Sequence, residues 1–401
     1  MITTINNKHN KLNVPNLRFP EFQGEWEKTK FGDIAVVVGG GTPDTNTSQY
    51  WNGKIQWFTP SEIGRNKYVY NSVRTISEEG LNKSSAKLLP IGTILLSSRA
   101  TVGECSINKK ECTTNQGFQS LIPKENISNE FVYYLIQTKR KDLIRKSCGS
   151  TFLEISANEV RKIVVSIPTI KEQDKIAKLL SLLDERISTQ SKIIEDLKKL
   201  KSAIIENHYN QTEKQTASIA DLGEPFSVGN LAKDDLTETG MPCVVYGELF
   251  TTYGETISQI ESHTNKTTGM ILSKKGDLLF PSSTTVDAMS LIAPSVINVD
   301  GVILGGDMFG IHINHNYNAQ YLSYYFNHIA KRQLAKFAKG STIIHLHYAD
   351  IEKAKLLLPS LEEQNRMAKC LVALDKKVSV EQNLLSSLTC QKSYLLQQMF
   401  I

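Results

Sequence analysis

The chain has 401 residues, a formal net charge of +5 and an apolar fraction of 40%. This length exceeds one ordinary hydrophobic core, so we expect two or more domains. The sequence has no run of about 18 apolar residues, which a membrane-spanning helix would need, and no signal-peptide-like apolar segment at its N-terminus. We therefore expect a cytoplasmic protein whose six scattered cysteines are free thiols rather than metal ligands.

The charge is distributed unevenly along the chain. Residues 1–166 contain 22 basic and 15 acidic residues, a net of +7, whereas residues 217–360 contain 10 and 14, a net of −4. The first segment therefore has the basic balance that suits a polyanionic ligand, and the second, taken whole, does not.

One stretch of sequence occurs twice at an offset of 191 residues. Ile167–Asp184 reads IPTIKEQDKIAKLLSLLD, and Leu358–Asp375 reads LPSLEEQNRMAKCLVALD. At the same offset Gly149–Thr151 matches Gly340–Thr342, and Tyr133-Tyr134 matches Tyr324-Tyr325. Further upstream the offset is 184, where Gly92–Ser98 parallels Gly276–Ser282. The chain is therefore a tandem duplication in which a globular segment is followed by a helical one, twice.

Both repeated stretches begin like long helices. Thr169–Glu172 and Ser360–Glu363 fit the S/T-x-x-E capping box. Positions spaced 4, 3, 4, 3 from Ile176 and from Met367 are apolar in seven of nine cases in each copy, and the polar breaks fall at the same steps. This is the seam of a coiled coil, and each helix would span roughly 55 Å. The seam residues around its centre are Leu183, Ile187, Gln190, Ile194, Leu374, Val378, Glu381 and Leu385.

A helix with one apolar stripe needs a partner. The matched polar breaks favour pairing between the two copies in an antiparallel coiled coil, with Gln190 facing Glu381. Pairing with another molecule is the alternative.

The fold class predicted is α+β, with two tandem mixed α/β domains, each followed by a long helix. Each globular half has short β-like runs such as Ile94–Leu96 and Leu278–Phe280, and a single helical stretch, Asn129–Lys146 or Ala319–Lys336. The predicted order is an N-terminal segment (1–25), a first domain (26–165), a central helical spacer (166–209), a linker (210–216), a second domain (217–357) and a C-terminal helical spacer (358–401).

No reactive constellation stands out in the sequence. Gly39–Thr42 lacks the GK[ST] ending of a phosphate-binding loop and is better explained as a turn. His312 with His315, and His345 with His347, have no supporting third ligand in sequence, and no GxSxG marks a nucleophile. Binding is therefore favoured over catalysis, and no cofactor site is predicted.

Basic clusters precede the Gly-Ser-Thr sequence in both halves. Lysine and arginine neutralise phosphates, and hydroxyl groups add hydrogen bonds, so these clusters indicate nucleic-acid binding. Arg99, beside Ser98 and Thr101 in a predicted turn, has the side chain that reads guanine in a major groove. The candidate DNA-binding residues are Arg65, Lys67, Tyr68, Arg99, Thr101, Arg140, Lys141, Arg145, Lys146, Ser150, Thr151, Ser283, Thr284, Lys331, Arg332, Lys336, Lys339, Ser341 and Thr342.

In these features the chain resembles the DNA specificity subunit of type I restriction–modification systems. The resemblance rests on Val14–Trp26, Tyr50–Gly53 leading to Trp57, Ser98–Gly103, Asn115–Gly117 and the IPxxxEQ start of the helix, in that order and with the duplication. The second half departs from it, because it has no YWxG and has Ser282–Val286 in place of SRATV.

The resemblance implies that each globular half is a target recognition domain for one half of a bipartite double-stranded DNA site. It implies that the paired helices set the spacer and dock two modification (methyltransferase) subunits, which restriction (translocase and nuclease) subunits join. The chain itself would not be catalytic, and S-adenosylmethionine, ATP and Mg would be bound by those partners. Two alternatives are a two-headed adaptor for protein or glycan ligands, and a fused methyltransferase–specificity enzyme, for which the sequence lacks an N/D-P-P-Y/F motif.

Overall fold

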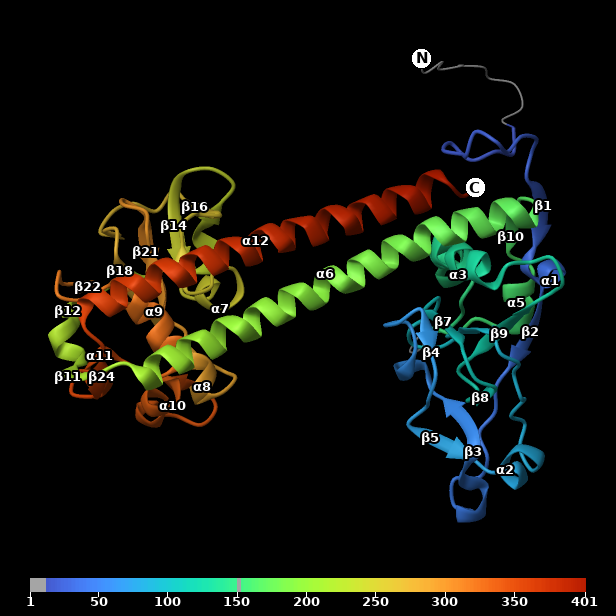
Figure 1. Cartoon of the computed structure of the whole chain (residues 1–401), viewed down its shortest axis with the longest axis horizontal. Coiled ribbons are helices and arrows are strands. Elements are labelled where there is room, and N and C mark those ends of the chain that lie inside the picture. Colours follow the sequence, from blue (N-terminus) through green and yellow to red (C-terminus); the bar gives the residue numbers. More distant parts are fainter. Residues whose placement is uncertain (1–11, 150–152) are drawn as a thin grey trace. The chain divides into compact units, whose positions relative to one another are not determined.

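The structure is a computed structural model that describes residues 12–149 and 153–401. It contains two compact units (Figure 1). Unit 1 comprises the chain up to Gln190 together with Leu384–Ile401, and unit 2 comprises Ser191–Asn383. Each unit holds one globular domain, called domain 1 and domain 2 below, and a part of each long helix.

The long helices are α6 (Ile170–Gln211, 42 residues) and α12 (Leu361–Gln398, 38 residues). In unit 2, Lys201 pairs with Asp375 and His208 with Glu363, so residues ascend along α6 as they descend along α12. In unit 1, Asp184 pairs with Lys392. The prediction that the two helices pair antiparallel is therefore confirmed. α6 runs two residues beyond the predicted spacer, which ended at 209.

The predicted heptad seam is the inward stripe of both helices, since none of its eighteen positions is exposed. The side chains of Gln190 and Glu381 are both buried. These two residues belong to different units, so the contact expected between them stays a prediction.

Domain 1 is built on a five-stranded sheet in the order β2-β9-β6-β7-β4, in which only the β4–β7 pair is parallel. A smaller sheet, β5-β3-β8, forms its outer part. The strands are β2 (Ala35–Gly39), β3 (Trp51–Phe58), β4 (Tyr68–Val69), β5 (Arg74–Ile76), β6 (Ile94–Leu96), β7 (Cys105–Asn108), β8 (Cys112–Thr114) and β9 (Gln119–Pro123).

Domain 2 repeats this sheet as β12-β22-β18-β20-β15, again with one parallel pair, β15–β20, at the same edge. Its outer sheet, β13-β16-β14-β21-β17, is larger than that of domain 1. The strands are β12 (Gly223–Ser227), β13 (Leu236–Thr237), β14 (Met241–Val245), β15 (Thr256–Ile257), β16 (Ser262–Thr264), β17 (Ile271–Leu272), β18 (Asp277–Pro281), β20 (Ser295–Ile297), β21 (Ile303–Gly305) and β22 (Met308–Ile313).

Short strand pairs begin and close each domain. β1 (Glu27–Lys30) pairs with β10 (Val164–Ile167), and β11 (Gln215–Ser218) pairs with β24 (Lys355–Leu358), both antiparallel. The minor strands β19 (Ser283–Thr284) and β23 (Ile344–His345) also pair. The short helices are α1 (Phe31–Ile34), α2 (Glu78–Asn82), α5 (Ala157–Arg161), α7 (Glu248–Thr251), α8 (Ala288–Leu291), α11 (Tyr348–Ile351) and the 3-10 turns at Ser48–Tyr50, Pro60–Glu62, Ile219–Leu222, Lys233–Asp235 and Ala335–Phe337.

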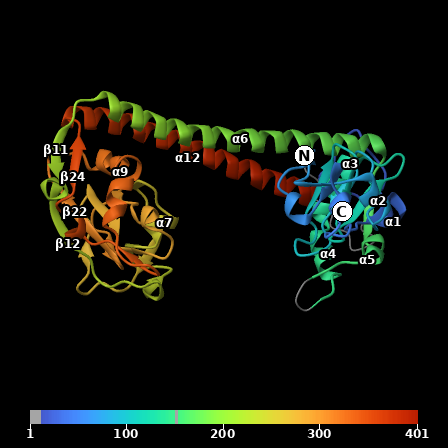
Figure 2. The same ribbon diagram turned by 90° about the horizontal axis from the view of Figure 1, so that it is seen from below.

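The single helix expected in each half is broken. Domain 1 has α3 (Asn129–Thr138) and α4 (Arg140–Arg145), and domain 2 has α9 (Ala319–His328) and α10 (Lys331–Leu334). The helices α3 and α9 are fully apolar on one side and pack between the sheet and the long helices, as Figure 2 shows for α9. The break frees the basic second helix to lie at the domain surface.

The equivalence of α3 and α9 has an offset of 190, so the 191-residue match of the tyrosine pairs is wrong by one residue. The true counterparts are Tyr134 and Tyr324, because each donates its hydroxyl to an aspartate of a long helix. Tyr134 reaches Asp184 at 2.6 Å, and Tyr324 reaches Asp375 at 2.5 Å. Each aspartate also binds a lysine, Lys392 in unit 1 at 2.6 Å and Lys201 in unit 2 at 2.8 Å. We call each tyrosine–aspartate–lysine set the polar anchor of its unit.

The glutamine of the repeated IPxxxEQ sequence ties each long helix to its domain. Gln173 donates to the Pro168 carbonyl and accepts from the Ser128 amide, both at 2.9 Å. Gln364 does the same with Pro359 at 2.9 Å and Asn318 at 3.0 Å. The motif is thus structural and joins the first turn of the long helix to the start of α3 or α9.

The preceding glutamates do not complete the capping boxes predicted for them. Glu172, which is 1% exposed, instead accepts two hydrogen bonds from Arg18 and one from Trp26. Glu363 accepts from Arg366 and lies 2.9 Å from His208. These carboxylates are worth more as buried partners of cations than as caps, because a bidentate arginine pair is a strong, charge-assisted interaction.

Two glycine-containing motifs of domain 1 also serve packing. A Cβ on Gly40 would lie 1.9 Å from the Asn115 carbonyl oxygen, and one on Gly53 would lie 2.4 Å from that of Ile76. The Gly39–Thr42 turn therefore exists to let two backbones approach, as a turn rather than a phosphate cradle. Trp57 donates its indole N–H to Gly41 at 2.9 Å, which closes the same contact.

Candidate nucleic-acid interface

The exposed loop between β6 and β7 presents Arg99 and Thr101 at the surface of domain 1. Ser97 Oγ donates to the Arg99 carbonyl at 2.9 Å and lies 3.0 Å from Thr101 Oγ1, so the loop is braced from within. Ala100 has a φ of 56°, a conformation costly for a residue with a Cβ. Arg99 Nε lies 2.9 Å from Glu154 Oε1, with both side chains exposed by more than two fifths. The guanidinium is therefore oriented and still open to a ligand.

The basic residues of α4 lie beside this loop. Arg140 contacts Glu104 at 2.8 Å with its side chain half exposed. Gly103 has a φ of 89°, and a Cβ there would lie 2.8 Å from Arg140 Cγ, so the loop glycine makes room for the arginine. Arg145 pairs with Asp142 within α4, and Lys146 lies 3.6 Å from Glu159. Lys141 is exposed and has no ion pair in the described part of the chain.

The structure places Lys67 and Tyr68 away from the exposed surface that a DNA contact requires. Lys67 Nζ contacts Glu130 at 2.9 Å and Tyr134 OH at 3.3 Å, and its side chain is 9% exposed. Tyr68 donates its hydroxyl to Glu130 as well. Burial lowers the pKa of Lys67, and Glu130 offsets this only partly. Neither residue gains geometric support as a DNA contact, because both are occupied in joining the domain to α6.

The other domain 1 candidates differ in what the structure says of them. Arg65 is exposed and has no ion pair among the described residues. Ser150 and Thr151 lie outside the described residues. The segment that carries them is closed at its base by paired Cys148 and Glu154, whose backbones exchange hydrogen bonds of 2.9 and 3.0 Å. This base adjoins the Arg99 loop through the Arg99–Glu154 bridge.

Domain 2 has a hollow of about 780 Å³ at the corresponding corner. Three of the predicted residues, Ser283, Thr284 and Lys331, line it together. Ser283 and Thr284 belong to β19, and Lys331 begins α10. The other lining residues are Tyr246, Gly247, Leu249, Phe250, Thr251, Tyr253, Gly254, Glu255, Thr285, Val286, Ser290, Ala293, Asn327 and Ile343. The sequence-predicted residues are thus brought into one concave site.

The chemistry of this hollow differs from that of the domain 1 surface. Lys331 and Glu255 are its only charged lining residues, whereas aromatic, hydroxyl and branched apolar side chains predominate. Val286 is 73% exposed and Ile343 is 50% exposed. Aromatic rings can stack on bases, apolar groups contact the thymine methyl, and asparagine can bind adenine. The hollow is therefore suited to bases more than to phosphates.

Basic residues surround the hollow on its α10 side. Arg332 and Lys336 are exposed, and neither has an ion pair within the described ranges. Lys339 contacts Asp350 at 2.5 Å, with three quarters of its side chain exposed. Ser341 and Thr342 are exposed in the turn that Lys339 and His345 close. These residues can reach a phosphate backbone beside a base held in the hollow.

Sequence reasoning missed Tyr246, Phe250, Tyr253 and Asn327. They lie far from the repeated motifs, in the stretch where the two halves share little sequence, and no spacing marks them. It also missed Glu255, Lys201 and Asp375 as a group. A signal was present for two of them, because Lys201 falls on the apolar seam and Asp375 ends the repeated stretch.

The histidine pairs do not gain further ligands. Within residues 12–149 and 153–401, no group of three or more His, Cys, Asp or Glu side chains is arranged to hold a metal ion. His345 and His347 stack with ring centroids 6.1 Å apart, and His312 contacts Asp277 at 2.6 Å. No helix in the described part of the chain is both long and apolar enough to span a bilayer.

A family model described as Type I restriction modification DNA specificity domain matches the chain twice, over residues 23–199 and 212–389. The MjaIX type I restriction enzyme specificity subunit of Methanocaldococcus jannaschii is 39% identical over 189 residues, which are 46% of this chain and 44% of that subunit. The chain thus aligns with less than half the length of this relative. The MjaVIII specificity subunit of the same organism is 22% identical over 401 residues, covering 93% and 91% of the two chains.

Solved structures agree in fold. The type I restriction–modification S subunit from M. genitalium has a TM-score of 0.60 at 16% identity, with 97% of this chain and 99% of that chain covered. A structure described by the complex assembly and conformational transition of the type I restriction–modification system has a TM-score of 0.59 at 15% identity, covering 93% and 97%. At such identities the likeness concerns the fold.

Proposed function

Because the chain belongs to the family of type I restriction modification DNA specificity domains, we propose that it supplies the DNA sequence specificity of a type I complex. The observation that carries this proposal is the pairing of equal frames with unequal tips. The two domains share one sheet order and one polar anchor, yet one presents a braced arginine loop and the other a nearly neutral hollow. Two related readers with different surfaces suit a bipartite, asymmetric site.

Domain 1 reads its half-site with the Arg99 loop. Arginine binds the O6 and N7 atoms of guanine in the major groove with two parallel hydrogen bonds. Glu154 holds the guanidinium in one orientation, which reduces the entropy lost on binding. Lys141, Arg140 and Arg145 on α4 contact phosphates and set the register of the domain on the duplex.

Domain 2 reads its half-site with the hollow. Asn327 and the hydroxyls of Ser283 and Thr284 supply hydrogen-bonding groups, while Val286 and Ile343 supply apolar contacts. Arg332 and Lys336 bind the flanking phosphates. This arrangement explains how a domain with a net charge of −4 over residues 217–360 can bind a polyanion, since its basic side chains are gathered beside the hollow.

The long helices act as the spacer between the half-sites. Two half-sites on one face of the duplex are separated by about 34 Å or its multiples. A helix of 42 residues extends about 63 Å, which is long enough to bridge such a separation.

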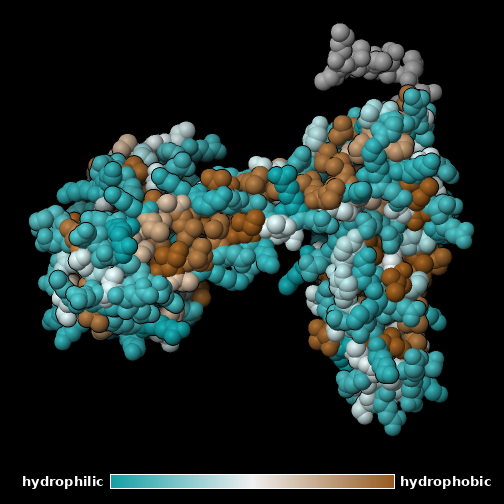
Figure 3. Space-filling model, viewed as in Figure 1, coloured by the Kyte–Doolittle hydropathy of each residue, from teal (hydrophilic) through white to brown (hydrophobic). Residues whose placement is uncertain are grey.

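The helices also dock two modification subunits, which restriction subunits join, and the chain itself performs no catalysis. S-adenosylmethionine, ATP and Mg²⁺ are bound by those partners. Apolar side chains remain exposed along α6 and α12 within each unit (Figure 3), among them Leu182 and Tyr394 in unit 1 and Leu200 and Val380 in unit 2. Exposed apolar patches of this kind support a protein interface.

The test is selection from a library of randomised duplex DNA by the full chain, followed by sequencing of the bound pool. We expect two conserved half-sites with a fixed spacer, and a steep loss of affinity with salt. Exchange of residues 217–357 for those of another family member should change one half-site only. A flat salt dependence with no selected sequence would instead favour the two-headed adaptor, and a change in both half-sites would contradict the modular reading.

A further inference from the structure

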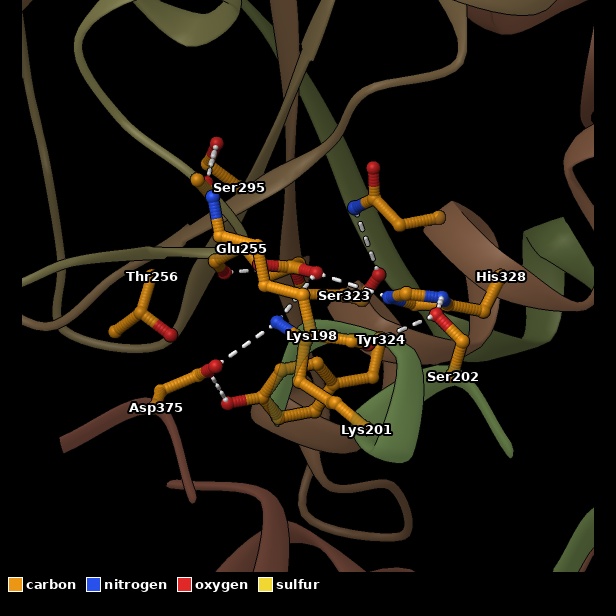
Figure 4. Close-up of polar contacts among 12 residues, drawn as sticks. Lys198, Lys201, Ser202, Glu255, Thr256, Ser295, Ser323, Tyr324, His328 and Asp375 are labelled. Carbon is orange, nitrogen blue, oxygen red and sulfur yellow. Dashed lines mark hydrogen bonds and ion pairs between the residues drawn. The ribbon is translucent and has the colours of Figure 1, made fainter. Parts of the chain in front are cut away.

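One carboxylate joins the wall of the domain 2 hollow to the helix α6. Glu255 lines the hollow and immediately precedes β15. Lys201 of α6 donates from Nζ to Glu255 Oε1 at 2.9 Å and to Asp375 Oδ1 of α12 at 2.8 Å. Figure 4 shows the ammonium group between the two carboxylates. One lysine therefore connects both long helices to a residue of the reading surface.

The helix α9 fastens the same wall from a second side. His328 Nε2 lies 3.0 Å from Glu255 Oε1, and Ser323 Oγ donates to the Glu255 carbonyl at 2.7 Å. Tyr324 of the same helix donates to Asp375. Because α9 also carries Asn327, which lines the hollow, the network holds two parts of the hollow at once (Figure 4).

The network is shielded from solvent. The side chain of Lys201 is 11% exposed and that of Glu255 is 19% exposed. Burial by itself would lower the pKa of Lys201, but Glu255 and Asp375 outweigh it and raise that pKa. Burial would likewise raise the pKa of Glu255, but His328 and Lys201 hold it at about 2. Both groups stay charged, and charged groups with few alternative partners fix one geometry.

We propose that Lys201, Glu255 and Asp375 are positioning residues for sequence recognition by domain 2. They hold the Tyr253–Glu255 wall of the hollow in register with the spacer helices, so the bases read there depend on a lysine that contacts no base. The inference rests on the proposed function. It adds specificity-determining residues outside the recognition domain itself, because Lys201 belongs to the helical part of the chain.

The test compares full-length variants in the selection from randomised duplex DNA and in titrations with single-base substitutions of the selected site. The variants are Lys201→Met, Lys201→Arg, Glu255→Gln and Lys198→Met. Lys198 is the matched control, because it is an exposed lysine one turn away on α6. For Lys201→Met and Glu255→Gln we expect discrimination at the second half-site to fall roughly fivefold or more, within the range that one base contact contributes. Lys201→Arg should restore it in part, and Lys198→Met should leave it unchanged.

Discrimination at the first half-site is the internal control, since a general loss of folding would lower both. Unchanged second-half discrimination in Lys201→Met, or an equal loss at both half-sites, would overturn the proposal. If Lys201→Met does not fold, Glu255→Gln decides the matter by the same two readouts. Failure of the wild-type chain to select any sequence would refute the proposed function, and a wild-type selection that the variants retain would refute only this inference.

Discussion

The polar anchors of the two units are alike at their centre and different around it. Both join a domain tyrosine, an aspartate of one long helix and a lysine of the other, and the aspartates and lysines are each 191 residues apart. Around this centre, unit 1 adds a second lysine and a carboxylate, Lys67 with Glu130. Unit 2 instead adds a carboxylate and a histidine, Glu255 with His328.

The two buried lysines show what the difference does. Burial lowers the pKa of Lys67, and its one close carboxylate, Glu130, does not compensate. Lys201 is also buried, yet Glu255 and Asp375 together raise its pKa. One carboxylate is not enough to offset the desolvation of an ammonium group, and two are. The centre of the anchor therefore fixes a domain to the helices, while the added groups adapt that fixation to each domain.

The largest effect should come from the apolar part of the shared frame. Leu180 and Leu371 are equivalent and both 0% exposed. Replacing either by alanine should lower the free energy of unfolding by about 2–5 kcal/mol, because each leaves a cavity. Urea denaturation measures this, with Leu182→Ala, 55% exposed in the wild type, as the control. A loss at one leucine only would show that the two frames are not equivalent.

The next effect concerns acid stability in unit 2. The folded-state pKa of Glu255 is about 2, below its ordinary value of 4.5. A depressed carboxyl pKa stabilises the folded state above the unfolded-state pKa, and the stabilisation is lost as pH falls from about 4.5 to 2. The full span corresponds to at most about 3 kcal/mol. Unfolding at several pH values should therefore show a shallower acid limb in Glu255→Gln. Parallel curves for wild type and variant would contradict the assigned ion pairs.

A smaller and matched effect is expected at the anchor tyrosines. Tyr134→Phe and Tyr324→Phe each remove one hydrogen bond to an aspartate without changing the ring. Each should lower the free energy of unfolding by about 1–2 kcal/mol, as for a hydrogen bond to a charged acceptor. Chemical denaturation of both variants beside the wild type is the measurement. The comparison of the two anchors would fail if only one substitution had an effect.

The smallest effect concerns phosphate contacts. Lys141 in domain 1 and Lys336 in domain 2 are exposed basic residues of the proposed interface. Replacing either by alanine should reduce the slope of log affinity against log salt by about 0.9, the value for one lost phosphate contact. DNA titrations at several salt concentrations measure this slope. Lys353→Ala, 92% exposed at its side chain and not part of the hollow, should leave the slope unchanged.

Sequence reasoning recovered the frame well because the frame is periodic. The 4-3 spacing from Ile176 and Met367 marked the inward stripe of α6 and α12, and the duplicated motifs marked the order of the elements. It placed Ser283, Thr284 and Lys331 among the candidates, and the structure brings them together in one hollow. It failed at Lys67 and Tyr68, because a basic residue in a variable loop looks the same in sequence whether it faces solvent or a buried glutamate.

The sequence by itself determined the duplication, the two long helices and the positions of their seams, because these follow from spacing along the chain. Only the tertiary structure decided that α3 and α9 are offset by 190 rather than 191 residues, and that Glu172 binds Arg18 instead of a helix terminus. It also decided that Lys201 of the helical spacer reaches Glu255 at the reading surface. Such contacts join residues far apart in the chain, and their energies depend on burial and on the number of charged neighbours, neither of which is set by local spacing.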